Sequence, residues 1–477
     1  MLPSPSPRAQ LRHRAAVPIA GFVLALILGS SAPVRSDSSA GEPLTLERAI
    51  ELAEEGNRGL AGARARRDGA AAGVDQARAE RRPRLDLGAA LQWTDNPTLV
   101  FSNKLAQGRF TADDFALDSL NHPDGIDHFS THLSLRQPLW TGGRLRAANA
   151  LAERGLDGAT AAVEITRQHL IFGVIEAHSA ASLATLEREV TRQALETAAA
   201  HVDLARDLYD AGLVVESDAL SAEVREAEVR ELHLAAASRS ELSRARLALI
   251  LGRSPNEPPT VSEILAELPP LPRKHDLEGA AARWLESPFE RQVDPSVVDP
   301  LRRRHPQLQA ARHAVEAAEL RRRLATNRRP EAGFEARFET NGSDPARWDE
   351  ENVTLGVGLS WNLDGQRRRA RGRAADAALT AEREALAELD DRLALDLRNA
   401  VLEGRTAQAR RDQTVRGIAL AEKSLLLVRD RYREGLVPLT ELLDTETALT
   451  RARLRDLAAR RDLLLAEARL RLALGLL

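Results

Sequence analysis

The sequence YDAGLVVESDALSAE at Tyr209–Glu223 returns as YREGLVPLTELLDTE at Tyr432–Glu446. These stretches lie 223 residues apart and contain the only two tyrosines of the 477-residue chain. The same offset aligns two longer segments without a gap, which begin at Gly142 and Gly365 and end at Gly252 and Gly475. Self-similarity at a fixed offset is typical of repeat architectures. The chain is therefore a tandem duplication, and the two tyrosines descend from one ancestral residue.

Each copy contains the same predicted elements in the same order. A helix (45–82 and 301–328) is followed by a strand, a polar loop, a second strand and a very long helix (144–210 and 366–433). A short break and a last helix complete the copy. In the second long helix, apolar residues recur three and four positions apart, which predicts a coiled coil. These residues are Leu386, Leu389, Leu393, Leu397 and Ala400.

The helix lengths predict how each copy packs. At 1.5 Å per residue the first long helix extends over about 100 Å. Two shorter helices, 45–82 and 217–250, together have about the same length and could flank it end to end. We therefore predict a first repeat at 41–252 and a second repeat at 301–477. The proline-rich segment 253–300 between them is expected to form an irregular equatorial insertion.

Four segments alternate between apolar and polar residues over nine or more positions. They begin at Leu85, Phe129, Glu331 and Val353. Such alternation is typical of transmembrane β-strands, although a half-buried soluble hairpin has the same period. Trp93 and Trp361 fall at strand ends, where an interfacial aromatic belt would place them. Four strands cannot close a barrel, and open edges are not tolerated in lipid. Three copies would supply twelve strands.

The N-terminal region 1–40 has the features of an export signal. Arginines precede the fifteen-residue apolar run AAVPIAGFVLALILG, and small residues follow, with cleavage expected near 36–40. We expect no later segment to span a membrane as a helix. The chain contains no cysteine, so we expect neither a lipid anchor nor a disulfide. A net charge of −3 does not fit a nucleic-acid-binding surface.

The chain resembles the outer-membrane efflux protein family, the TolC-like channel-tunnels. The resemblance rests on QPLWTGGR from Gln137, its degenerate twin SWNLDGQR from Ser360, and the two Tyr-x-x-Gly-Leu-Val stretches. It implies a mainly α fold with a β-barrel part, in a homotrimer with a twelve-stranded barrel in outer-membrane lipid and a helical tunnel in the periplasm. It also implies a passive exit duct, whose cargo (a drug, a metal ion or a polypeptide) the sequence does not identify. Such a duct works in a tripartite efflux pump or type I secretion system, with a periplasmic adaptor protein and an inner-membrane pump or ABC transporter.

The repeated tyrosine stretches are expected to be turns between antiparallel helices. Gly212 and Gly435 suit the left-handed position after a helix, with Leu213 and Leu436 as the accompanying apolar contact. Ser217 and Thr440 are expected to cap the next helix. The resemblance implies that these turns close the tunnel entrance and face the adaptor. The adaptor-facing residues would be Gly212, Leu213, Val214, Gly435, Leu436 and Val437.

The resemblance also implies a lock at the entrance. Asp218 and Tyr432 match positions that link neighbouring coils, and Tyr209 is the repeat counterpart of Tyr432. The chain departs from the best-known pattern at Val437, where an arginine would add a salt bridge. Alternatively, Asp218 only complements the positive end of its own helix.

Two acids of the last helix form a further candidate site. Glu441 and Asp444 lie three residues apart and so share one helix face. The resemblance implies that they point into the narrowest part of the lumen, where a trimer would place six carboxylates in one cation-binding ring. The alternative is an ordinary first-turn acid beside a solvated one.

The histidines are scattered, and the nearest approach to a cluster, HPDGIDH from His122, lies in a predicted loop. We find no phosphate-binding loop and no Ser/His/Asp arrangement, so we expect neither an enzyme nor a cofactor. Two alternatives to a channel are a periplasmic coiled-coil adaptor and a structural outer-membrane spacer without conductance.

Overall fold

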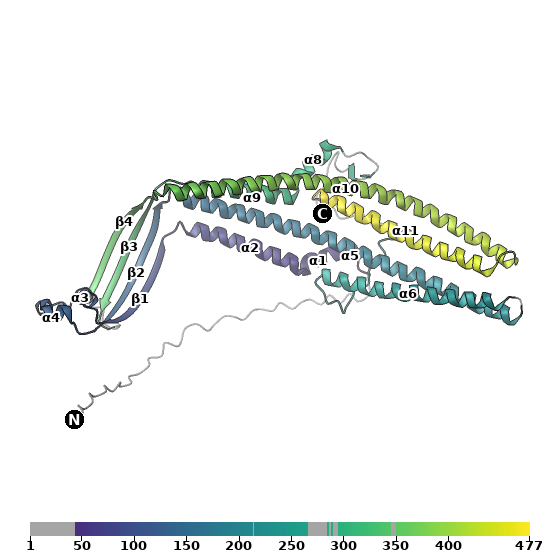
Figure 1. The fold of residues 1–477 in the computed structure, drawn as a ribbon, viewed down its shortest axis with the longest axis horizontal. Helices are drawn as coiled ribbons and strands as arrows, with labels where there is room; N and C mark the ends of the chain where they lie inside the picture. The colour runs from purple at the N-terminus through teal and green to yellow at the C-terminus, as the bar shows by residue number, and fades with distance from the viewer. Residues whose placement is uncertain (1–42, 213, 266–283, 286–287, 290–293, 345–349) are drawn as a thin grey trace, which may run out of the picture. The chain divides into compact units, whose positions relative to one another are not determined.

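A computed structural model describes the chain from Pro43 to Leu477, apart from residue 213 and the segments 266–283, 286–287, 290–293 and 345–349. The predicted export signal at 1–40 lies outside the described residues. Two very long helices, α5 (Arg144–Asp210) and α10 (Gly365–Arg433), dominate the described part (Figure 1). Their observed ends lie within one residue of those predicted from the sequence.

Shorter helices flank each long helix, as predicted. Helices α2 (Arg58–Ala79) and α6 (Glu216–Ile250) pack along α5. Helices α9 (Pro306–Ala325) and α11 (Leu439–Ala473) pack along α10 in the same way (Figure 1). Because α5 also packs against α9 and α11, the two copies share one helical layer.

The first predicted helix of each copy is broken, contrary to expectation. The 45–82 helix divides at Asn57 into α1 (Leu46–Gly56) and α2, and the Asn57 side chain accepts a hydrogen bond from the Leu60 N–H at 3.1 Å. In the second copy, α8 (Pro295–Arg303) ends just before His305, whose Nδ1 accepts from the Gln307 N–H at 3.2 Å and caps α9. A side-chain acceptor at this position gives the next helix a separate N-terminus. The two breaks are 248 residues apart, the offset that also aligns Leu60 with Leu308.

Four antiparallel strands form one sheet in the order β1-β2-β3-β4. They are β1 (Arg84–Thr94), β2 (Ile126–Trp140), β3 (Glu331–Gly342) and β4 (Glu350–Ser360). Strands β2 and β3 belong to different copies, so their pairing joins the repeats a second time.

The loop between β1 and β2 carries three short helices. They are α3 (Pro97–Ala106), η1 (Ala112–Phe115) and α4 (Leu117–Asn121), which lie at the end of the sheet remote from the long helices (Figure 1). The HPDGIDH stretch falls at the end of this loop and the start of β2.

The strand register gives the sheet one apolar and one polar face. Leu87 lies opposite Leu133, Leu133 opposite Phe338, and Phe338 opposite Val353, so one apolar row crosses all four strands. The neighbouring row consists of Asp86, Ser134, Arg337 and Thr354. On the edge strands the apolar row is open, with Leu87 75% and Val353 68% exposed. This face therefore needs a covering that the described chain does not provide.

Helix α5 contradicts the expectation that no later segment could span a membrane as a helix. By length and composition alone, one 18-residue window of α5 qualifies. Half of that window is buried within the chain, as expected for a helix that packs in a core.

A buried histidine in the middle of α5 forms a hydrogen bond with the start of the described chain. His178 is fully buried, and its Nε2 donates a hydrogen bond to the Leu44 carbonyl at 2.8 Å. Its Nδ1 has no partner among the described residues. Burial lowers the pKa of His178 below its ordinary value of 6.5, although the hydrogen bond to Leu44 opposes this shift.

We predict that this anchor weakens in mild acid. Since the folded-state pKa lies below the ordinary value, the folded chain binds fewer protons, and stability falls as pH drops through about 6.5. His178→Gln retains an N–H donor but does not titrate. Its thermal unfolding midpoint, measured by circular dichroism between pH 7.5 and 5.5, should fall less than that of the wild type. His122→Gln, in the exposed loop, is the control and should behave like the wild type. An equal pH response in His178→Gln would contradict this assignment.

Candidate channel entrance at the helix turns

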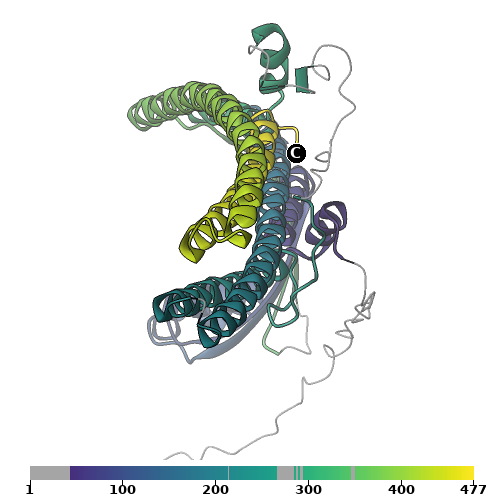
Figure 2. The ribbon, with the colours of Figure 1, turned by 90° about the vertical axis from the view of Figure 1, so that its right-hand side faces the viewer.

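The two tyrosine stretches form the turns between α5 and α6 and between α10 and α11. Gly212 and Gly435 have φ values of 72° and 73°, in the left-handed region that we predicted. At the second turn, the Leu436 N–H donates to the Arg431 carbonyl and the Gly435 N–H to the Tyr432 carbonyl, each at 2.9 Å. These two bonds define a Schellman motif. Figure 2 views this end of the helices, where the two hairpins lie beside each other.

Two details of the predicted turns are wrong. Leu436 is 68% exposed and so makes no buried contact at the helix end, while Leu213 lies outside the described residues. The following helices begin at Glu216 and Leu439, so Ser217 and Thr440 lie inside the first turn rather than at the cap. The cap positions are occupied by Val215 and Pro438, whose side chains accept no capping hydrogen bond. Their extended backbone already sets the entry into each helix.

An apolar cluster holds the two hairpins together just behind the turns. It draws on all four helices, and we call it the tip cluster. Its buried members are Val202, Ala205, Ala219, Ala222, Val428, Leu439, Leu442 and Leu443. Tyr432 and Val437 pack against this cluster. Val437 is thus used for packing at the position where the resemblance implies a salt-bridging arginine.

The two tyrosines have different surroundings. Tyr432 is partly buried, and its pKa is raised by burial and by the nearby negative charge of Asp218. No hydrogen bond joins Tyr432 to Asp218 among the described residues, so the chain brings this predicted pair near but does not link it. Tyr209 is 44% exposed.

Glu441 and Asp444 are exposed on one side of α11, whereas Leu442 and Leu443 between them are buried in the tip cluster. The helix therefore directs the two acids away from its own chain. Among the described residues, no group of three or more potential ligands could hold a metal ion. A cation site built on these acids would need more than one chain.

Sequence reasoning missed a polar link between the two hairpins. The His201 Nε2 on α5 lies 2.9 Å from a Glu446 carboxylate oxygen on α11, and both side chains are largely buried. In the first hairpin, the repeat counterpart Glu223 instead pairs with Arg206 of its own hairpin at 2.6 Å. The duplication pairs Glu223 with Glu446, but it could not reveal that their partners differ.

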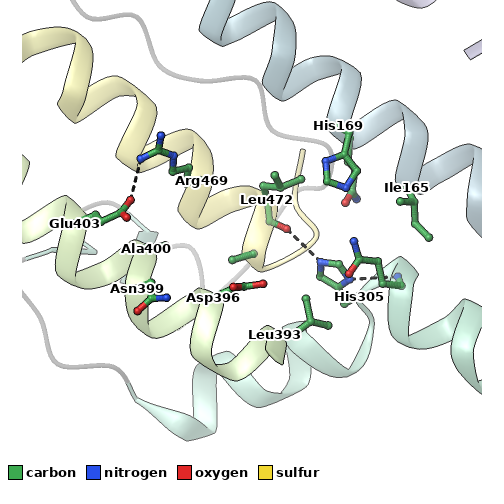
Figure 3. A pocket seen from close by; sticks show the side chains of 13 residues that line it. Ile165, His169, His305, Leu393, Asp396, Asn399, Ala400, Glu403, Arg469 and Leu472 are labelled. Carbon is green, nitrogen blue, oxygen red and sulfur yellow. Dashed lines mark hydrogen bonds and ion pairs between the residues drawn. The ribbon is translucent and has the colours of Figure 1, made fainter. Parts of the chain in front are cut away.

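The middle of the helical layer contains a cavity of about 300 Å³ (Figure 3). His305 lies in its wall and donates through Nε2 to the Leu472 carbonyl at 3.2 Å, while its Nδ1 caps α9. Burial lowers the pKa of His305. Arg469 and Glu403 pair across the cavity edge at 2.9 Å. Both nitrogens of His305 are thus engaged in holding helices together.

Comparison with known proteins identifies the fold and the family. The sequence matches the family described as outer membrane efflux protein at residues 49–253 and 297–476. The chain belongs to the outer membrane efflux protein family. The predicted family and the mainly α fold with a small four-stranded antiparallel sheet are confirmed, and this fold matches that of known outer-membrane channels. The chain is therefore an outer-membrane protein of a channel family. No curated protein sequence matches it.

Solved structures of outer-membrane proteins share this fold. The outer membrane protein VceC of Vibrio cholerae has a TM-score of 0.70 at 20% identity, covering 90% of this chain and 96% of that one. The CmeC outer membrane channel of Campylobacter jejuni has a TM-score of 0.70 at 13% identity, with coverage of 90% and 85%. The open state of the MtrE outer membrane channel of Neisseria gonorrhoeae has a TM-score of 0.69 at 17% identity, with coverage of 90% and 88%.

We predict that Glu446→Gln loosens both hairpin tips, because it weakens a largely buried link between them. The matched control is Glu223→Gln, which weakens a pair inside one hairpin. Loss of one such link costs about 1 kcal/mol, which corresponds to roughly five-fold faster local opening. Amide hydrogen exchange should accelerate at both turns in Glu446→Gln, but only near the first turn in Glu223→Gln. Identical exchange maps for the two variants would refute this role of Glu446.

Proposed function

We propose that the protein is a trimeric outer-membrane channel-tunnel that forms the exit duct of a tripartite efflux pump or type I secretion system. One observation carries this proposal: the sheet of this family member has an open apolar face and two edge strands, β1 and β4, without partners among the described residues. In lipid, unpaired strand edges are not tolerated. Three copies joined edge to edge would form a closed twelve-stranded barrel with that face toward lipid.

The two repeats, 41–252 and 301–477, would then supply the wall of a periplasmic tunnel, with 253–300 as the equatorial linker. The turns lie at the opposite end of the long helices from the sheet, and so would form the periplasmic entrance (Figure 1). Exposed backbone and apolar groups at Gly212, Gly435 and Leu436 support contact with an adaptor protein. Val214 and Val437 are half-buried and would shape the turns from within. Leu213, which lies outside the described residues, is proposed as an adaptor contact from its sequence position alone. An inner-membrane pump or ABC transporter would deliver the cargo.

We propose that contacts between hairpins hold the entrance closed. Within one chain, Asp218 lies near Tyr432 on the other hairpin, and His201 pairs with Glu446. Tyr209, the exposed repeat counterpart of Tyr432, is available to a neighbouring chain. Opening would require the hairpins to separate, which the tip cluster and these polar contacts oppose.

Glu441 and Asp444 would form the acidic ring of the entrance. Both are exposed and share one side of α11 close to the turn. Asp444 has Ser221 as its repeat counterpart, so the second hairpin alone carries both acids. Carboxylates gathered around a narrow passage concentrate cations there.

The first test is whether the purified protein forms trimers that conduct. We expect chemical crosslinking in detergent to stop at a three-chain species and planar bilayers to show discrete conductance steps. A structural spacer would insert as an oligomer without conductance, so trimers that never conduct would refute the channel. Monomers that remain soluble without detergent would refute the barrel.

The second test concerns the acidic ring. We predict that the wild-type channel is cation-selective and is blocked by multivalent cations added from the entrance side. Glu441→Gln with Asp444→Asn should lose most of this block, because the double variant removes the carboxylates. Glu384→Gln with Asp391→Asn is the control, since it removes one Glu and one Asp from exposed positions of α10 remote from the turn. Unchanged block in the ring variant, or equal loss in the control, would exclude the ring.

A further inference from the structure

Arginines gather where the strands meet the helices. The four segments 78–84, 144–146, 321–329 and 367–373 contain four, two, five and five arginines, respectively. Their only acid is Glu80. The whole chain carries a net charge of −3, so this is a local concentration of charge and not a general basic character. We call these residues the junction arginines.

Most junction arginines are not used inside the chain. Five of the sixteen form ion pairs: Arg144 with Glu331 at 2.7 Å, Arg322 with Asp376, Arg78 with Glu153, Arg84 with Asp86 and Arg367 with Asp364. By contrast, Arg369, Arg371 and Arg373 at the start of α10 are exposed and form no ion pair among the described residues. The same holds for Arg81 and Arg82 before β1, and for Arg328 and Arg329 before β3. Crowded like charges repel each other, so the fold itself does not explain this arrangement.

Two tryptophans mark the same end of the sheet. Trp140 ends β2 and Trp361 follows β4, and their side chains are 55% and 61% exposed. The Trp361 Nε1 donates to the Arg328 carbonyl at 2.8 Å, which ties this ring directly to the arginine-rich segment before β3. Along the molecule, exposed apolar strand residues are thus followed by exposed indoles and then by unpaired arginines. Apolar, aromatic and cationic layers in this order match the passage from a bilayer core to its headgroups.

We propose that the junction arginines bind the headgroups of anionic phospholipids, such as phosphatidylglycerol, in the membrane leaflet that faces the periplasm. This inference rests on the proposed function, because it needs the sheet in the membrane and the helices on its periplasmic side. The planar guanidinium group binds phosphate through two parallel hydrogen bonds. Each basic residue near an anionic surface contributes about a five-fold gain in affinity.

This binding would fix the depth of the sheet in the membrane. The apolar rows of the sheet resist movement into water. By themselves, however, they allow the sheet to shift along the membrane normal by a fraction of the height of the apolar band. Arginines on all four strand–helix connections would oppose movement of the junction away from the headgroup plane. The long helices would then leave the membrane from a fixed level.

The test compares two sets of three arginines on the same helix. The junction variant combines Arg369→Gln, Arg371→Gln and Arg373→Gln. The control combines Arg398→Gln, Arg411→Gln and Arg416→Gln, which are also exposed and form no ion pair among the described residues. The full chain is inserted into vesicles of phosphatidylcholine and brominated phosphatidylglycerol. Quenching of tryptophan fluorescence gives the binding of phosphatidylglycerol relative to phosphatidylcholine.

We expect the wild type and the control to prefer phosphatidylglycerol about five-fold, and this preference to disappear near 1 M salt, where charges are screened. The junction variant should show a clearly smaller preference, although it keeps the arginines of the other three strand–helix connections. Replacing the same three arginines with lysine should restore the preference, which separates lost charge from lost folding. Arg81→Gln with Arg82→Gln provides a second variant on another strand–helix connection if the first does not insert.

Two results would overturn the proposal: no preference in the wild type, or an equal loss in the junction variant and the control. Retention of the wild type on isolated peptidoglycan, lost in the junction variant without a change in lipid preference, would assign the arginines to the cell wall instead. Conductance in pure phosphatidylcholine is measured in parallel. Conductance without a lipid preference would support the channel and refute the lipid site. A lipid preference without conductance would support the lipid site and refute the channel.

Discussion

A backbone N–H or C=O group that faces lipid without a hydrogen-bond partner costs several kcal/mol, and this constraint shapes the whole molecule. The chain builds a sheet with a continuous apolar face but ends it at β1 and β4, whose outer edges have no partner among the described residues. The edges of a barrel strand can be satisfied only by closure. In the proposed barrel, assembly with further copies would thus be a requirement of the sheet. The arrangement of the helices around a common axis would follow from it.

Because of the duplication, both copies share one plan of helices and strands. The copies differ, however, in the contacts made near the helix turns, where the two hairpins pack against each other. Tyr432 is packed and Tyr209 is exposed, although both occupy the same place in their turns. Glu223 forms a pair within its hairpin, whereas Glu446 reaches His201 of the other hairpin. In the proposed trimer, hairpins of the two copies would alternate around a ring, so contacts within a chain and contacts between chains would not be equivalent. Such divergence allows the two kinds of contact to have different strengths.

The parts that the sequence predicts well are those in which one physical pattern continues over many residues. Alternation over four strands predicted the apolar face, and an unbroken helical period predicted both ends of α5 and α10 to within one residue. The breaks at Asn57 and His305 depend on single capping side chains inside otherwise helical sequence, so periodicity conceals them. The His201–Glu446 link joins residues 245 positions apart and depends on helix packing. For the turns, the left-handed glycines could be predicted because few other residues adopt that backbone, whereas the exposure of Leu436 depends on what surrounds the tip.

The near-zero net charge conceals a polarised molecule. Unpaired arginines concentrate where strands become helices, and the exposed acids Glu441 and Asp444 lie close to the opposite ends of the long helices. If the helices extend into the periplasm as proposed, the positive end would lie against an anionic membrane surface and the negative end would lie at the entrance. If the charges were reversed, carboxylates would lie beside the lipid phosphates and be repelled by them. The entrance would then carry positive charge and would repel cations. The same distribution of charge can thus favour one depth of the sheet in the membrane and the binding of cations at the entrance. The two ends act without touching each other, because almost the full length of α10 separates them.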